Sequence, residues 1–454
     1  MTPPHAFVDA VHRFGRRQCL VSGDRSLTYE QLGELVHSAG ENLAGAVPPG
    51  AVAAMAAGFC AESVAALLWL LSRPASAALL PPGEPPELAE RLRICEAEAF
   101  IQAGPGRLEA RALPSQGAHH PLLRRLAEPL RPGLVLFSSG STGEPKAMVH
   151  DFARFVGRYP VRAARDFRVV AFLELDHVGG LDTLLRCLSA GMTLVVPDDR
   201  TPEAVCEAIE RHRGTVLPAS PTFLNLLLAT GADRRFDLSS LAIIGYGAEP
   251  MPEATLRRCR ERFPGVRLQQ KYGTSETSAV RVRSRSPDSL WMRVDDHGVQ
   301  HRIVDGELWL RSESQILGYL NAGADASRFT ADGWYRTGDL VEEREEEGCR
   351  YFRIRGRASD WINVGGRKVM PHDVEAALLE LEQVADCRAY PVANAVTGQA
   401  VAVEVVFREG VDAADGRRAV LRHCAARLER HKHPVRVEAV ASLAAGARLK
   451  KPRR

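Results

Sequence analysis

The chain has 454 residues, with 59 Lys and Arg against 56 Asp and Glu and a formal net charge of +3. At about 150 residues per domain this length predicts two to three domains, and the near-balance of charge argues against a nucleic-acid binder. Nine cysteines without a C-x-x-C pair fit neither a disulfide framework nor a zinc site. We therefore expect a cytoplasmic protein that binds a small molecule.

The segment AVAAMAAGFCAESVAALLWLL, residues 51 to 71, carries one charge, at Glu62, and is long enough to span a bilayer. Its first part is rich in Ala and Gly and only weakly hydrophobic. A strand followed by an amphipathic helix from about Ala61 is therefore the favoured interpretation. The N-terminus lacks the apolar run of a signal peptide. We expect no membrane association.

Short apolar runs alternate with helical stretches from about residue 25 to 340. VVAFLEL precedes GLDTLLRCLSAG, TLVVP precedes EAVCEAIERHRG, and LAIIGYG precedes EATLRRCRERFPG. This alternation predicts βα units, with parallel sheets covered by helices. Residues 341 to 357, VEEREEEGCRYFRIRGR, predict a solvated hairpin with an acidic turn. The following helix, strand and helix patterns predict a small α+β domain.

Residues 138 to 147, SSGSTGEPKA, form a loop rich in glycine and hydroxyls between the strand pattern LVLF and the extended segment AMVH. The backbone amides of such a loop can form a nest for an anion, and its hydroxyls and single ammonium add donors for phosphate oxygens. It differs from the common phosphate loop because Pro145 precedes Lys146 and moves Glu144 away from helical angles. Taken alone, the loop fits a triphosphate site or a flexible connector.

Further stretches follow the loop in a fixed order: GYGAEPMP (245 to 252), QKYGTSETSA (270 to 279), GELWL (306 to 310), GYLN (318 to 321), GWYRTGDL (333 to 340) and GRASDWINVGGRKVMPHDVE (356 to 375). Together with LTYEQLGELVHSAGENLAG near the start, the series resembles the adenylate-forming superfamily of acyl-CoA synthetases, aryl-CoA ligases, peptide-synthetase adenylation domains and firefly luciferase. The resemblance covers nearly the whole chain.

The resemblance implies an α/β fold with two domains. A large N-terminal domain, residues 1–356, would contain parallel-rich sheets layered with helices plus a β-subdomain. A small mobile α+β domain, residues 357–454, would rotate after the first half-reaction. The activity implied is attack of a carboxylate on the α-phosphorus of ATP, with loss of pyrophosphate and formation of an acyl-adenylate. Donors and Mg²⁺ around the phosphate oxygens would stabilise the transition state.

The resemblance also implies roles for particular residues. Glu276 corresponds to the magnesium ligand, Ser275 to a contact of the α-phosphate, and Thr274 lies beside the substrate carboxylate. Magnesium suits one hard carboxylate together with phosphate oxygens and water. The loop that closes over the β- and γ-phosphates of ATP corresponds to Ser138, Ser139, Gly140, Ser141, Thr142, Gly143 and Lys146.

The rest of the nucleotide would be held by residues from three other motifs. Adenine is expected against Gly247, Ala248 and Glu249, with Tyr272 packed on the ring and Gly273 beside it. Asp339 would hold both ribose hydroxyls, and Arg357 would reach the same ribose. The structural alternative is a buried salt bridge between Asp339 and Arg357, which would also leave the two side chains near each other.

The acyl group and its acceptor have fewer sequence markers. His177 matches a residue that gates the acyl pocket, although a histidine beside a glycine pair is also compatible with a structural role. Peptide-synthetase domains have Asp at this point, whereas here Asp176 lies one residue away, so an acid without an α-amine is favoured. Gly365 and Gly366 match a segment that lines the pantetheine tunnel. They favour CoA, or the phosphopantetheine arm of a carrier protein, as the acceptor.

Two positions depart from the family pattern. Ser359 occupies the hinge position, where Asp or Lys is usual. The chain ends AAGARLKKPRR, and a gap-free match puts Arg448 where the family has a catalytic lysine, with Lys450 two residues on. Arginine and lysine are not interchangeable at a positioned site. A register shift would restore Lys450 or Lys451, and the alternative is a disordered basic tail.

The favoured function is an ATP-dependent acid–CoA ligase for an aryl or modest-sized acid, acting as a monomer or homodimer. One alternative is a stand-alone adenylating enzyme that loads a carrier protein or an amine. Another is a nucleotide-binding homologue whose catalysis is impaired by the altered tail.

Overall fold

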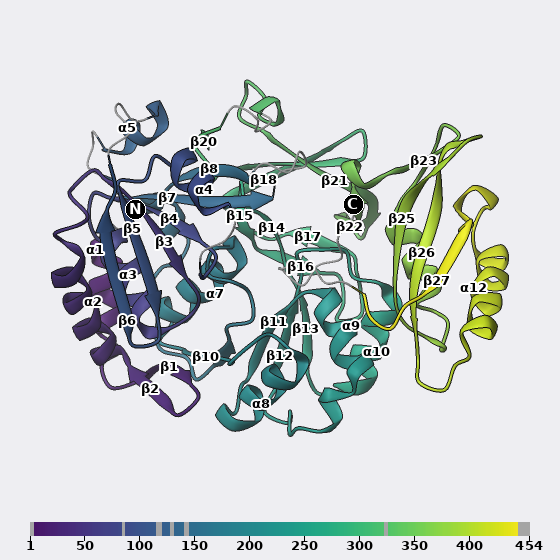
Figure 1. Cartoon of the computed structure of the whole chain (residues 1–454), viewed down its shortest axis with the longest axis horizontal. Helices are drawn as coiled ribbons and strands as arrows, with labels where there is room; N and C mark the ends of the chain where they lie inside the picture. The colour runs from purple at the N-terminus through teal and green to yellow at the C-terminus, as the bar shows by residue number, and fades with distance from the viewer. Residues whose placement is uncertain are drawn as a thin grey trace.

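The computed structural model describes residues 4–83, 87–114, 120–127, 131–139, 145–321 and 326–443. Figure 1 shows the N-terminal half at the left and a separate C-terminal unit at the right, next to α9 (Pro221–Thr230) and α10 (Glu253–Arg262). The expected fold class, a large α/β part followed by a small α+β part, is confirmed.

The first seven-stranded sheet has the order β20-β8-β7-β4-β3-β5-β6. Its centre is parallel, and β6, β8 and β20 pair with their neighbours in the antiparallel sense. The strands are β3 (Val52–Ala57), β4 (Ser76–Leu80), β5 (Ala99–Gly104), β6 (Arg107–Ala112), β7 (Gly133–Ser139), β8 (Pro145–Asp151) and β20 (Gly318–Tyr319). The helices of this region are α1 (Pro4–His12), α2 (Tyr29–Leu43), α3 (Ala61–Leu71), α4 (Leu88–Ile94), α5 (Pro121–Ala127) and α6 (Phe152–Val156).

The apolar segment of residues 51 to 71 forms strand β3 and helix α3, as expected. The expectation of an amphipathic helix is wrong, because residues 63–71 of α3 are all buried. The helix packs with α2 and the sheet in the largest core cluster. Such packing explains a helix that is apolar on all sides. Over the described part of the chain, none of the helices combines the length and the apolarity that crossing a membrane requires.

The second seven-stranded sheet has the order β13-β12-β11-β9-β10-β1-β2 and is parallel except for the edge strand β2. Its strands are β1 (Gln18–Ser22), β2 (Arg25–Thr28), β9 (Arg168–Val170), β10 (Thr193–Val196), β11 (Val216–Ala219), β12 (Ile243–Tyr246) and β13 (Arg267–Gln270). The helices α7 (Val178–Ser189), α8 (Pro202–His212), α9 and α10 alternate with them. The predicted βα alternation is confirmed, except that VVAFLEL contributes only the short strand β9.

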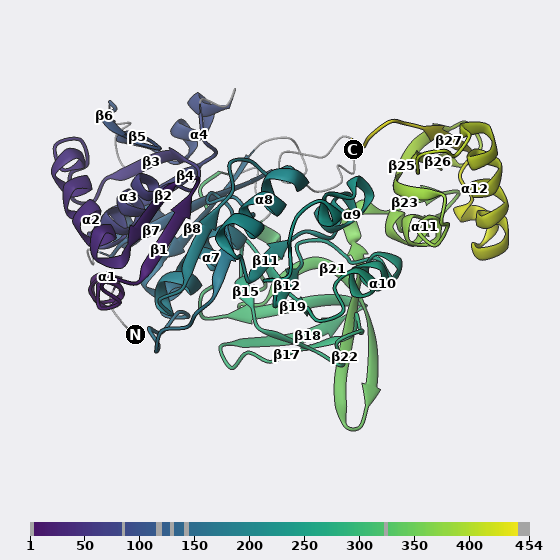
Figure 2. The ribbon, with the colours of Figure 1, turned by 90° about the horizontal axis from the view of Figure 1, so that it is seen from below.

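The predicted β-subdomain is an antiparallel sheet of order β16-β17-β22-β21-β19-β18. Figure 2 shows its longest hairpin, β21–β22, projecting away from the body of the molecule. Glu347 and Gly348 form its turn with positive φ values of 52° and 71°. The strands are β16 (Val282–Ser284), β17 (Met292–Val294), β18 (Val299–Val304), β19 (Glu307–Ser312), β21 (Tyr335–Glu346) and β22 (Cys349–Arg357), and a two-stranded hairpin of β14 (Tyr272–Thr274) and β15 (Ser278–Val280) lies beside it.

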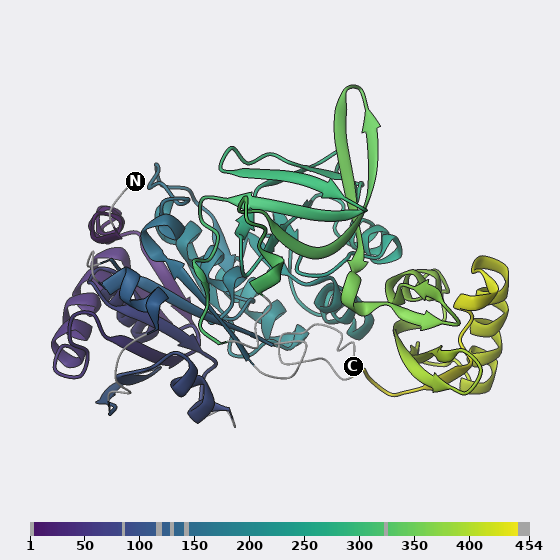
Figure 3. The same cartoon turned by 90° about the horizontal axis from the view of Figure 1, so that it is seen from above.

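The C-terminal unit has its own core and its own sheet. Figure 3 shows it beyond the end of β22, with α12 on its far side. It contacts the rest of the chain through Ala254 of α10, which joins its core, and through Asn225 Nδ2, which donates to the Ala385 carbonyl at 3.1 Å. Its elements are β23 (Ile362–Val364), β24 (Arg367–Val369), α11 (Pro371–Leu378), β25 (Val384–Asn394), β26 (Gly398–Phe407), α12 (Ala413–Arg427) and β27 (Arg436–Ala439). Short 3-10 turns are η1 (Ala232–Arg234), η2 (Ala326–Arg328), η3 (Ala358–Asp360) and η4 (Arg430–Lys432).

Candidate active site

The predicted phosphate loop connects two paired strands. Ser138 lies opposite Lys146, and Ser139 lies opposite Pro145, in the antiparallel ladder of β7 and β8. Lys146 is half-buried. The rest of the predicted loop, Gly140, Ser141, Thr142 and Gly143, lies outside the described residues. The structure therefore places the first and last residues of the loop, on the neighbouring strands β7 and β8.

Strand β20, from the GYLN segment, pairs with β8, the strand that follows this loop. Tyr319 pairs with Met148 of β8. Asn321 Nδ2 donates to the Pro145 carbonyl at 2.8 Å, and Asn321 Oδ1 accepts from Ala147 N at 3.1 Å. Sequence reasoning quoted this segment but gave Asn321 no role. The Asn321 side chain therefore binds the backbone of β8 at the residues immediately before and after Lys146.

The segment QKYGTSETSA forms strand β14, a tight turn and strand β15, which pair as a hairpin. Gly273 permits this, because a Cβ at that position would lie 2.7 Å from the Ser278 carbonyl oxygen. Thr274 Oγ1 accepts from Thr277 N at 3.1 Å across the turn. Ser275 and Glu276 occupy that turn, so the hairpin presents them at its tip.

Glu276 contacts the sheet that carries the predicted phosphate loop. Its Oε1 accepts from Tyr319 Oη at 3.2 Å, and its carbonyl accepts from Ile316 N at 2.8 Å. Burial, reinforced by the Glu276 charge, raises the pKa of Tyr319 and of Tyr335. Because Tyr319 belongs to β20, next to β8, the structure brings Glu276 and the strand of Lys146 into one site.

The surroundings of Glu276 fit the magnesium ion that the family implies. Among the described residues no three His, Cys, Asp or Glu side chains gather into a metal cage. Glu276 therefore offers one hard carboxylate rather than a protein-built site, and Mg²⁺ bound this way takes its other ligands from phosphate oxygens and water. Tyr319, Tyr335 and Arg328 near this carboxylate were not singled out in the sequence.

Asp339, Tyr272 and Arg357 form a second cluster. Asp339, 6% exposed, accepts from Tyr272 Oη at 2.7 Å and from Arg357 Nε at 3.2 Å, and it lies opposite Arg357 in the β21–β22 ladder. Burial, followed by the Asp339 charge, raises the pKa of Tyr272, and the same carboxylate raises the pKa of Arg357. The salt bridge of the structural alternative is present, but only its Asp339 end is buried, and it places the two predicted ribose ligands side by side.

The GYGAEPMP segment continues from the end of β12. A Cβ on Gly247 would lie 2.5 Å from the Lys271 carbonyl oxygen, and Ala248 has a positive φ of 72°. Glu249 Oε1 accepts from Thr222 N at 2.8 Å, in the first turn of α9. The segment is thus held against the strand that leads into Tyr272, while the Glu249 carboxylate stabilises a helix start.

His177 is the N-cap of α7, and its Nδ1 accepts from Gly179 N at 3.1 Å. The neighbouring Gly180 is required by packing, because a Cβ there would lie 1.9 Å from the Glu174 carbonyl oxygen. The structural role left open for His177 is therefore present. Its expected role as a gate of the acyl pocket stays a prediction.

Gly365 and Gly366 form the turn between β23 and β24, with φ values of +58° and +84°. The turn alone accounts for both glycines, because these angles favour residues without a Cβ. Ser359 lies in η3, and its Oγ donates to Asp360 Oδ1 at 3.0 Å. Arg448, Lys450 and Lys451 lie outside the described residues.

His150 of β8 is a buried residue of this region that sequence reasoning missed. It is 1% exposed, and burial lowers its pKa to about 4, partly offset by the backbone of Ser275 and Ser314. The ring is therefore neutral at pH 7.

We expect His150 to make the protein acid-sensitive. The unfolded chain binds a proton at this ring near pH 6.5 and the folded chain only near pH 4, so stability is complete above pH 6.5 and falls as the pH approaches 4. The expected loss is about 3 kcal/mol. Urea unfolding at pH 7 and pH 4.5 should show a smaller difference for His150→Leu than for the wild type. An equal difference would contradict the prediction.

Comparison with known proteins defines the family. The model of the AMP-binding enzyme family matches residues 7–320, and the model of the AMP-binding enzyme C-terminal domain matches residues 373–447. The chain belongs to this family, which confirms the resemblance to adenylate-forming enzymes.

Three relatives illustrate the similarity. Indoleacetate–CoA ligase of Aromatoleum aromaticum is 29% identical, over 91% of this chain and 89% of its own length. 4-Coumarate–CoA ligase-like 9 of Arabidopsis thaliana is 28% identical over 62% of this chain, and the match spans only 54% of that protein. The crystal structure of the anthranilate CoA ligase AuaEII in complex with anthranoyl-AMP has a TM-score of 0.81 and 22% identity, covering 98% of this chain and 95% of that one. The structural match shows that the fold is shared.

Proposed function

We propose that this protein is an AMP-forming acid–thiol ligase, which activates a carboxylic acid with ATP as an acyl-adenylate and then transfers the acyl group to CoA. One observation carries the proposal: Tyr319 hydrogen-bonds Glu276 from the strand next to β8, the strand that contains Lys146. The names of the curated relatives described above support the same class of reaction.

The proposed chemistry assigns each cluster a part of the nucleotide. Lys146 and the hydroxyl-rich loop would donate to the outer phosphates, and Asp339 with Arg357 would hold the ribose. Glu276 would hold Mg²⁺, which supplies positive charge next to the phosphate oxygens. Because negative charge grows on those oxygens during the attack on the α-phosphorus, donors fixed around them lower the barrier without reorganising. The pairing of β7 with β8 and the hydrogen bond from Asn321 to the Pro145 carbonyl support that fixed geometry.

The proposal also covers the acyl acceptor, the domain boundary, the location of the protein and its oligomeric state. CoA is the favoured thiol, with a carrier-protein phosphopantetheine as the alternative. We place the domain boundary between residues 356 and 357, at the end of β22, and expect rotation there between the two half-reactions. The described cysteines have free thiols, and all of them except Cys349 are buried. They support the proposal of a cytoplasmic enzyme, acting as a monomer or homodimer.

A coupled assay tests the proposal. Purified protein with ATP, Mg²⁺, CoA and a panel of aromatic, aliphatic and amino acids should release AMP and form an acyl-CoA. Acid-dependent pyrophosphate exchange without any acyl-CoA would select a carrier protein or an amine as acceptor. ATP or AMP binding by calorimetry, without exchange for any acid, would select the impaired homologue and contradict the proposal.

The basic tail gives a separate prediction. If Arg448 or Lys450 replaces the family lysine, the alanine variant at that position should lose adenylation by roughly a hundredfold, because a charge on the α-phosphate is worth about 3 kcal/mol. The same variant should keep the thioester half-reaction when it is given a preformed acyl-adenylate. Two variants that both match the wild type in pyrophosphate exchange would show that the tail is not catalytic.

A further inference from the structure

Lys271 immediately precedes Tyr272, in the segment that leads from β13 into the hairpin β14–β15. Its backbone N donates to the Tyr246 carbonyl at 2.7 Å, at the end of β12. Its aliphatic chain lies over this strand: a Cβ on Gly245 would be 3.3 Å from Lys271 Cε, and a Cβ on Gly247 would be 3.0 Å from Lys271 Cβ. The glycines at 245 and 247 therefore leave space for the lysine side chain.

Neighbouring residues of an extended chain point to opposite sides. Tyr272 points to Asp339, the predicted ribose ligand. Lys271 consequently points away from the nucleotide cluster. Its electrostatic neighbours are Asp182 and Arg186 of α7 and Arg267 of β13.

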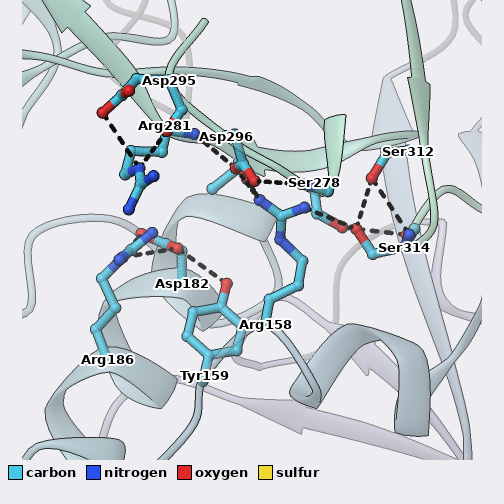
Figure 4. Close-up of polar contacts among 12 residues, drawn as sticks. Arg158, Tyr159, Asp182, Arg186, Ser278, Arg281, Asp295, Asp296, Ser312 and Ser314 are labelled. Carbon is cyan, nitrogen blue, oxygen red and sulfur yellow. Dashed lines mark hydrogen bonds and ion pairs between the residues drawn. The ribbon is translucent and has the colours of Figure 1, made fainter. Parts of the chain in front are cut away.

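The one carboxylate among these neighbours is already neutralised. Arg186 Nε donates to Asp182 Oδ1 at 2.9 Å and to Oδ2 at 2.8 Å, and Tyr159 Oη donates to Oδ1 at 2.9 Å (Figure 4). These contacts lower the pKa of Asp182 against the effect of its burial. Among the described residues, none forms an ion pair or a hydrogen bond with the Lys271 ammonium. Within the described ranges its charge therefore has no directly bonded counter-ion.

The side chain is exposed to solvent, yet the surrounding protein, followed by the charge of Arg186, lowers its pKa to about 8. The exposure and the lowered pKa are compatible, because the end of the Lys271 side chain meets solvent while protein atoms surround its aliphatic part. The ammonium is still charged at pH 7. A partly desolvated cation without a partner loses hydration that no protein charge replaces, so an anion is the ligand that suits it.

We propose that Lys271 is a specificity-determining residue, whose ammonium binds a second anionic group, a carboxylate or a sulfonate, at the end of the acid substrate opposite the reacting carboxylate. The inference rests on the proposed function, because it concerns the acid that this site activates. It narrows the expected substrate from an aryl or modest-sized acid to an acid with two negative charges. Lys271 lies on the side of the chain that faces Asp182 and Arg186 of α7, which separates this anionic group from the phosphates.

The test compares matched pairs of acids that differ in one anionic group: benzoate with terephthalate, butyrate with succinate, and acetate with sulfoacetate. Pyrophosphate release gives kcat/KM for each acid. The wild type should prefer the doubly charged member by about tenfold or more, and Lys271→Met should reduce that ratio by about tenfold. Arg283→Met, which removes an exposed cation from β16, is the matched control and should leave the ratio unchanged.

A second measurement needs no variant. As the pH rises through about 8, Lys271 loses its charge, so the preference of the wild type for the doubly charged acid should decline while activity on the singly charged acid persists. Equal or reversed preference in the wild type, unchanged by Lys271→Met, would overturn this inference and leave the proposed function intact. If no acid of any pair released pyrophosphate, the proposed function would fail and this inference with it.

Discussion

Replacing Glu276 by Gln should lower the adenylation rate by roughly a hundredfold or more, because the neutral amide cannot hold Mg²⁺ next to the phosphates. The substitution keeps the shape of the side chain, and its amide oxygen can still accept from Tyr319 Oη, now 3.2 Å from Glu276 Oε1. The fold should therefore be unaffected. Pyrophosphate exchange measured against Mg²⁺ concentration should show a lower maximum and a higher midpoint.

The control for this variant is Glu313→Gln. Glu313 is an exposed carboxylate close to the Ile316 backbone that bonds Glu276, so it tests the loss of one negative charge in the same region. Its Mg²⁺ titration should match that of the wild type. A Glu276→Gln enzyme with a normal Mg²⁺ titration would show that this glutamate only orders Tyr319 and the hairpin tip.

The second large effect is expected for Asp339→Asn. If Asp339 holds the ribose hydroxyls, loss of its charge should raise the KM for ATP by roughly a hundredfold, since hydrogen bonds to a charged group contribute about 1.5–3 kcal/mol. Stability should change less than nucleotide binding, because the Arg357 side chain is 58% exposed and water screens its pairing with the buried Asp339. Steady-state kinetics and the thermal midpoint separate the two effects.

Tyr272→Phe serves as the comparison for Asp339. It removes the hydrogen bond of 2.7 Å to the carboxylate and keeps both the ring and the negative charge. The expected rise in the KM for ATP is about tenfold or less. If Asp339→Asn instead lowered the thermal midpoint by several degrees with an unchanged KM for ATP, the salt bridge would be structural and the ribose assignment wrong.

Much of the fold could be predicted from the sequence. The alternation that indicated βα units corresponds to α7, β10, α8, β12 and α10, and the acidic hairpin corresponds to β21–β22. These features could be predicted because helices and strands depend on the spacing of apolar residues that are close together in the chain. The expectation of an amphipathic α3 failed for a tertiary reason: residues 63–71 are buried because neighbouring elements cover the helix on all sides.

The order of the site segments, the hydroxyl-rich loop and the candidate carboxylates Glu276 and Asp339 could all be identified in the amino-acid sequence. Which of these groups lie in contact depends on the tertiary fold. Tyr319 reaches Glu276 and Arg357 reaches Asp339 because strands pair across the chain. Among the described residues Lys271 has no ion pair, because Arg186 already binds Asp182. A hydrogen bond or an ion pair depends on distances of a few ångströms between side chains, and the linear order of residues does not fix those distances.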